Sequence, residues 1–175
     1  GLNGALFTNG TGGNYFTAVA GFTEVVTSLS ASGANFALAA APTVNFFKIC
    51  AQSSLANNLT GAGFACANPI LTGHLTGVNA SNFSISDPTP VLLDQSPNND
   101  QWNGQLSVTG SGATSITVQI DSANSDYFTD LDLINALVFS FFNSSQVVPF
   151  RQVDPSRCLS NNGATDCNEA SNLGQ

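Results

Sequence analysis

Histidine and cysteine are the residue types here that most readily carry proton transfer, metal binding or crosslinking, and the chain has one His and four Cys. The histidine, His74, lies between Gly73 and Leu75, and histidine is the side chain suited to acid–base work near neutral pH. No Gly-x-Ser-x-Gly motif presents a serine nucleophile. No pair of carboxylates stands out for glycosidase chemistry. We therefore expect a surface or strand-end histidine, no catalytic residues, and a protein that is not an enzyme.

The cysteines form two sets that are close in sequence, Cys50 with Cys66 and Cys158 with Cys167. Four cysteines permit three pairings, and we favour these two local disulfides. Neither set has the tight C-x2-C spacing of a zinc site. Disulfides indicate an exported protein. A chain that starts at Gly1 and contains no Met fits a mature product from which a leader was removed.

An acidic loop, DSANSDYFTDLD, offers hard oxygen ligands of the kind that calcium prefers. Its candidate ligands are Asp121, Asn124, Asp126, Asp130 and Asp132. The loop lacks the glycine and the final glutamate of the twelve-residue helix-loop-helix calcium pattern. Asp and Asn also form turns and caps for local reasons. We predict no cofactor, and calcium at this loop remains the alternative.

The single tryptophan, Trp102, lies in the polar stretch DQSPNNDQWNG. An aromatic ring among amides and acids is typical of a platform on which a sugar ring stacks. A partly buried Trp that covers one end of a β-sandwich is the competing interpretation.

Acceptor sites for N-linked sugar have the form Asn-x-Ser/Thr. They occur at Asn9, Asn58, Asn79, Asn82 and Asn143. A chain so rich in Asn, Ser and Thr would contain about four by chance, so their number alone does not indicate glycosylation. The stretch NASNFS (79–84) has the alternative interpretation of a polar turn that runs into a strand.

Lys48 interrupts an apolar strand in VNFFKICA. We expect an edge-strand lysine whose ammonium reaches water or guards the edge. The alternative is an isopeptide crosslink to an Asn, assisted by a buried carboxylate such as Glu24.

Turn signals recur along the chain, while strong helix formers are scarce and β-branched residues, Phe and Gly are plentiful. The clearest unit, residues 104–121, alternates apolar and polar residues on both sides of GSGA, which predicts a β-hairpin. Further strands are predicted over 24–30, 35–39, 43–51, 74–78, 90–94, 136–142 and 146–150, with a short helix over 129–137. The fold class is all-β, an antiparallel β-sandwich or jelly-roll-like single domain (1–175) with two local disulfides.

Only 8% of residues are charged and the formal net charge is −8. An average soluble domain is about 25% charged. With three basic residues the chain has no means of neutralising a phosphate backbone, so we exclude nucleic acid as a partner. The apolar runs are far shorter than the roughly 20 residues that cross a bilayer, and we predict no transmembrane anchor.

A β-rich protein normally guards its strand edges with charge or Pro, and this chain has one Lys. We therefore predict a structural subunit of an extracellular, pilus-like filament or surface assembly. Its partner would be a second copy joined by β-strand addition. The donor would be residues 1–22, which carry no charge, and residues 151–175 would form a disulfide-closed C-terminal segment. The alternative is a secreted carbohydrate- or surface-binding β-sandwich module, since such modules share this composition.

Overall fold

The computed structural model describes residues 10–57, 62–92, 106–128 and 136–143. Apart from one 3-10 turn at Thr11–Gly13, the regular elements of these residues are strands, which confirms the all-β prediction. The strands are β1 Tyr15–Phe22, β2 Glu24–Ser30, β3 Gly33–Leu38, β4 Asn45–Gln52, β5 Leu71–Leu92, β6 Leu106–Ala123 and β7 Ala136–Asn143. Among the described residues no helix has the length and hydropathy to cross a membrane.

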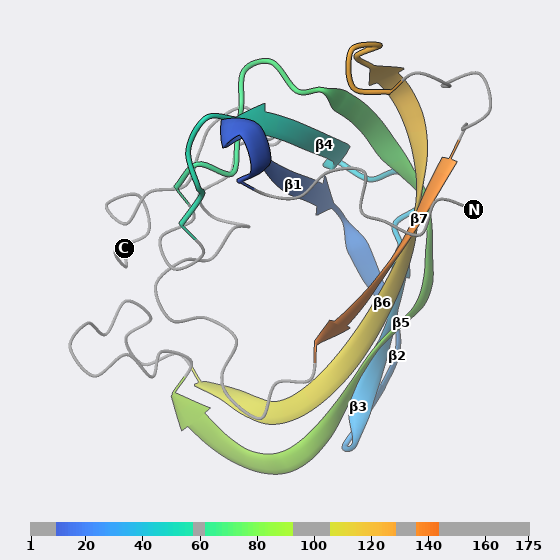
Figure 1. Cartoon of the computed structure of the whole chain (residues 1–175). Coiled ribbons are helices and arrows are strands. Elements are labelled where there is room, and N and C mark those ends of the chain that lie inside the picture. The colour runs from blue at the N-terminus through green and yellow to red at the C-terminus, as the bar shows by residue number, and fades with distance from the viewer. Residues whose placement is uncertain (1–9, 58–61, 93–105, 129–135, 144–175) are drawn as a thin grey trace, which may run out of the picture.

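All seven strands belong to one antiparallel sheet centred on β5. One edge of β5 pairs first with β4, at residues 71–73, and then with β3, at residues 81–84. The other edge pairs with β6 along its length, and β6 carries β7. In Figure 1 the long strands β5 and β6 sweep together through a wide arc. Three strands, β1, β2 and β7, pair with a single neighbour each and are the sheet edges of the described structure.

The hairpin predicted over 104–121 is wrong, because residues 106–123 run straight through GSGA as one strand. The two glycines serve close approach between strands and not a turn. A Cβ at Gly110 would lie 2.4 Å from Phe83 Cζ, and one at Gly112 would lie 2.3 Å from the Asn82 carbonyl oxygen. Pairing with the long β5 therefore overrides the local turn signal.

Other predicted strands are confirmed, one with the predicted ends and the others with shifted ends. The strands predicted over 24–30, 35–39, 43–51 and 136–142 correspond to β2, β3, β4 and β7. The strand predicted over 74–78 and residues 90–92 of the one predicted over 90–94 belong to the single β5, in which NASNFS is an irregular strand segment and not a turn. Residues 93 and 94 lie outside the described residues. The predicted helix ended at 137, but Ala136 and Leu137 begin β7. Its other residues, and the strand predicted over 146–150, lie outside the described residues.

One face of the sheet carries the core and is called the inner face here, and the opposite one is the outer face. Five buried residues form the core cluster: Phe47, Leu71, Leu75, Ile116 and Val118. Leu38 and Ile120 pack against this cluster from β3 and β6. Cross-strand partners in an antiparallel sheet share a face, so the inner face continues from this core through Phe36, Ser81 and Phe83.

β4 is a central strand, which corrects the prediction for Lys48. Lys48 pairs with Val19 of β1 on one side and with Thr72 of β5 on the other. The half-buried Lys48 side chain therefore does not guard a sheet edge. Glu24, named above as a buried carboxylate, is exposed at the start of β2.

Candidate functional site

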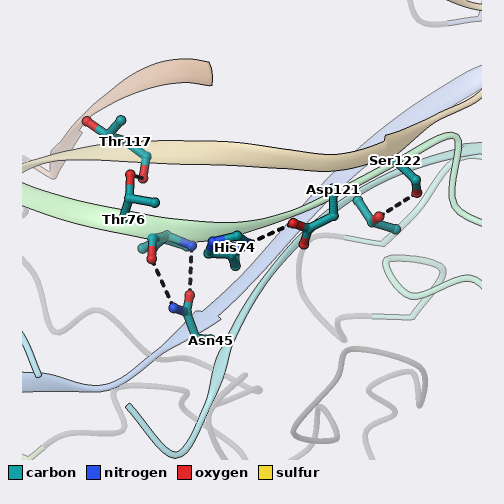
Figure 2. Close-up of polar contacts among 8 residues, drawn as sticks. Asn45, His74, Thr76, Thr117, Asp121 and Ser122 are labelled. Atoms are coloured by element: carbon teal, nitrogen blue, oxygen red, sulfur yellow. Dashed lines mark hydrogen bonds and ion pairs between the residues drawn. The ribbon is translucent and has the colours of Figure 1, made fainter. Parts of the chain in front are cut away.

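A polar cluster on the outer face of β5 and β6 contains the only histidine of the chain (Figure 2). The Nδ1 atom of His74 lies 2.8 Å from Oδ1 of Asp121, and the two side chains are 42% and 50% exposed. A β-bulge makes this contact. Asp121 has no partner in the register, because Ile120 pairs with Gly73 and Ser122 pairs with Thr72. Bulges re-aim side chains in this way, often next to functional sites.

Further polar contacts fix the backbone around His74. The Thr72 and Ser122 hydroxyls lie 2.6 Å apart. The amide of Asn45 donates to the Leu75 carbonyl at 2.9 Å and accepts the Leu75 N–H at 2.7 Å. The last main-chain pair between β4 and β5 is Phe47 with Gly73. Beyond that pair, the Asn45 side chain takes over the hydrogen bonding between the two strands. Figure 2 shows these contacts on either side of the histidine.

The chemical capacity of this cluster is that of an oriented imidazole. Asp121 holds Nδ1, so Nε2 is the ring nitrogen left for a ligand or proton. Among the described residues no serine or threonine hydroxyl bonds to the ring, and no group of three or more His, Cys, Asp or Glu side chains could hold a metal ion. His74 and Asp121 thus provide an oriented acid–base group, and no nucleophile lies beside it among the described residues.

The calcium candidates are placed only in part. The Asp121 carboxylate contacts His74, and the Asn124 side-chain oxygen accepts the N–H of Asp126 at 2.8 Å. The N–H groups of Tyr127 and Phe128 bond to the Asn124 carbonyl. Asn124 therefore forms a local turn, the alternative role expected for it. Asp130 and Asp132 lie outside the described residues.

The disulfide predicted between Cys50 and Cys66 is confirmed, with the Cα atoms 6.0 Å apart. Cys50 is fully buried. The Thr17 hydroxyl donates to the Phe64 carbonyl at 3.0 Å, and the Gln52 amide donates to the Gly63 carbonyl. The bridge and these bonds fasten the segment after β4 to strands β1 and β4. Cys158 and Cys167 lie outside the described residues.

Two of the sugar acceptor sites lie on β5. Asn79 is exposed and its amide donates to the Thr117 hydroxyl at 3.2 Å, while the Asn82 amide donates to the Ala80 carbonyl at 3.1 Å. Asn143 ends β7. Asn9 and Asn58 lie outside the described residues, as does Trp102, the predicted platform for sugar stacking.

A hollow of about 200 Å³ opens between β2, β3, β5 and β6, and we call it the inner-face hollow. It is lined by Glu24, Phe36, Ser81, Asn82, Phe83, Gly112, Ala113 and Thr114. Ser81 is 5% exposed, and its hydroxyl lies 3.0 Å from that of Thr114. One acidic residue, two phenylalanines and a hydroxyl pair thus line one small hollow, which combines apolar rings with a few polar groups.

Sequence reasoning did not find this hollow, because its residues come from four strands that only the topology brings together. One signal was available. Gly110 and Gly112 interrupt the apolar alternation of β6, and glycine within a strand often marks a site where another group approaches closely.

Comparison with known proteins finds no family model, no curated protein and no solved structure that matches this chain.

Proposed function

We propose that this chain is a structural subunit of an extracellular filament or surface assembly, joined to further copies by β-strand addition. The observation that carries the proposal is the chemistry of the three sheet edges. β1 and β7 contain no charged residue, and β2 contains Glu24 alone. Monomeric β proteins blunt such edges with Lys, Pro or covering segments.

Strand β2 illustrates an edge without protection. All seven of its residues are exposed. Three large apolar side chains are open to water: Val25 is 46% exposed, Val26 57% and Leu29 80%. Burial of such side chains would stabilise the protein. An added strand would pair the free N–H and C=O groups of β2 and cover these side chains.

The N-terminal segment is the proposed donor. In the single chain, residues 15–22 pair with β4 over eight registered positions, from Tyr15 with Gln52 to Phe22 with Asn45. The same eight positions can be supplied by a neighbouring copy, since exchange of an identical element between copies needs no new contact. Thr23 alone separates β1 from β2, so Thr23 is where the chain would turn outward.

The proposal also includes export of the protein and closure of its curved sheet. The Cys50–Cys66 bridge supports an oxidising, extracellular location, where sugar can be attached to an exposed residue such as Asn79. The second disulfide, Cys158 with Cys167, and a sandwich or jelly-roll closure of the curved sheet remain part of this proposal. Both depend on residues beyond those described.

Size-exclusion chromatography and negative-stain microscopy of the full-length chain test the assembly. We expect polymers from the native chain, and none after deletion of residues 1–22. A peptide of residues 1–22 should restore the solubility of the truncated chain, because it returns the missing main-chain hydrogen bonds. A full-length protein that stays monomeric at all concentrations, with its disulfides intact, contradicts the proposal.

A further inference from the structure

We propose that the inner-face hollow binds one ring of a neutral saccharide. This binding site goes beyond assembly and holds whether or not the chain polymerises. The site is argued from described residues alone, whereas Trp102, through which the sequence suggested a sugar-binding module, lies outside them.

The rings of Phe36 and Phe83 supply the apolar part of the site. Both phenylalanines line the hollow and are half-buried, so each ring has carbon surface left to cover. The Phe83 ring lies directly over Gly110, where a Cβ would come within 2.4 Å of Phe83 Cζ. Glycine at this position therefore sets how deep the ring sits. Saccharide rings carry a face of C–H groups, and aromatic side chains cover such apolar surface while the polar edge of the ligand stays wet.

The polar groups of the hollow match hydroxyls, which both donate and accept. The Ser81 and Thr114 hydroxyls, 3.0 Å apart, share one hydrogen bond and keep further donor and acceptor capacity. The Glu24 carboxylate at the rim accepts only, and one carboxylate can receive two neighbouring hydroxyls. Ser81 is among the few buried polar residues of the described structure, at 5% exposed.

Backbone strain provides a second, independent observation at the same place. Ala80 has φ of 54°, and it is the one described non-glycine residue with positive φ. It lies in a bulge where the β5–β6 register jumps between Asn79 and Asn82. The bulge contains Ala80 and Ser81, which together stand opposite Thr114. Strained residues of this kind cost about 1–3 kcal/mol and cluster at ligand sites.

The size and charge of the site favour a neutral ring over an organic cation. A volume of about 200 Å³ is below the roughly 300–1,000 Å³ of pockets for drug-sized ligands, which suits a single ring. Glu24 is exposed, and solvent weakens an ion pair at such a position. An ammonium group would also offer no acceptor to the O–H groups of Ser81 and Thr114, because it only donates hydrogen bonds.

Saturation-transfer-difference NMR on the intact chain tests the site, with glucose, galactose, mannose and N-acetylglucosamine as probes and methylammonium as the competing cation. We expect signals from at least one sugar and none from the cation. Glu24→Gln should weaken sugar binding about tenfold, since the charged acceptor is replaced by a neutral amide that accepts a weaker hydrogen bond. Phe83→Ala should abolish it. Asp126→Asn is the matched control, because this exposed carboxylate lies in the turn after β6.

Three results would overturn the proposal: no signal from any sugar, sugar binding that neither Glu24→Gln nor Phe83→Ala changes, or cation binding that Glu24→Gln removes. Glu24→Gln alters only an exposed side chain, so it keeps the test valid if Phe83→Ala fails to fold. Chromatography of the same samples reports the state of assembly separately, so failure of either proposal is distinguishable from failure of the other.

Discussion

His74 on β5 and Asp121 on β6 are joined across a β-bulge, with 2.8 Å between Nδ1 and Oδ1. An ionised carboxylate only accepts hydrogen bonds, so the neutral imidazole must carry its proton on Nδ1. We expect Asp121→Asn to shift that proton toward Nε2, because an amide can also donate. Long-range ¹H–¹⁵N spectra in alkaline buffer measure the tautomer. Stability should fall by only about 0.2–1 kcal/mol, as for other exposed pairs.

Ser122→Ala is the control for this substitution. It removes the hydroxyl contact with Thr72 and leaves the carboxylate of Asp121 in place. An imidazole tautomer that is the same in native protein and in Asp121→Asn would show that Asp121 does not orient the ring.

Asp87 predicts a dependence of stability on acid pH. The backbone N–H of Thr89 donates to Asp87 Oδ1 at 2.8 Å, and this bond, followed by the bond to the Thr89 side chain, lowers the pKa of the Asp87 carboxyl below its ordinary value of 3.8. A lowered pKa in the folded state stabilises the protein above the unfolded value. That contribution is lost as pH falls below 3.8 and through the folded pKa.

NMR titration of the native protein measures the pKa of Asp87, with Thr89→Val as the comparison. The variant keeps the backbone N–H and loses the hydroxyl, so we expect the pKa to rise only part of the way toward its ordinary value. A native pKa at or above 3.8 would contradict the prediction.

The period-2 alternation of Ile116, Val118 and Ile120 correctly predicted a strand with one face in the core, because side chains of a strand alternate between faces. The glycines before it were ambiguous. GSGA has the composition of a turn and also of a strand that another backbone approaches closely, and only the long-range partner, β5, decides between them. The sequence pattern therefore predicted correctly which side chains are buried, but it predicted a turn where the strand continues.

The candidate sites also differ in whether they depend on local or on long-range contacts. Cys50 and Cys66 are only 16 residues apart, and their pairing was predictable from proximity. The contact of His74 with Asp121 spans 47 residues and depends on a bulge. The sequence pattern carries no mark of that bulge, since one extra residue in a strand changes no composition.

The Cys50–Cys66 bridge predicts a measurable loss of stability on removal. A loop of 16 residues corresponds to about 3 kcal/mol in the chain-entropy account of disulfides. We expect Cys50→Ser with Cys66→Ser to lower the free energy of unfolding by about that amount, measured in urea. Removal of Cys158 and Cys167 in a separate double variant tests the predicted second bridge. Four thiols that react with an alkylating reagent in the native protein before reduction would contradict both bridges.

Gly112 predicts how tightly β6 approaches β5. A Cβ at this position would lie 2.3 Å from the Asn82 carbonyl oxygen, which is main chain and cannot rotate away. We expect Gly112→Ala to force the strands apart and to cost about 1–3 kcal/mol of unfolding free energy, as overpacked substitutions do. Gly77→Ala is the matched control on β5, since its Cβ would meet nothing closer than 3.7 Å, and it should change stability little. Urea unfolding of the two variants compares them directly. If Gly112→Ala is as stable as Gly77→Ala, then GSGA does not lie against β5 in the folded protein.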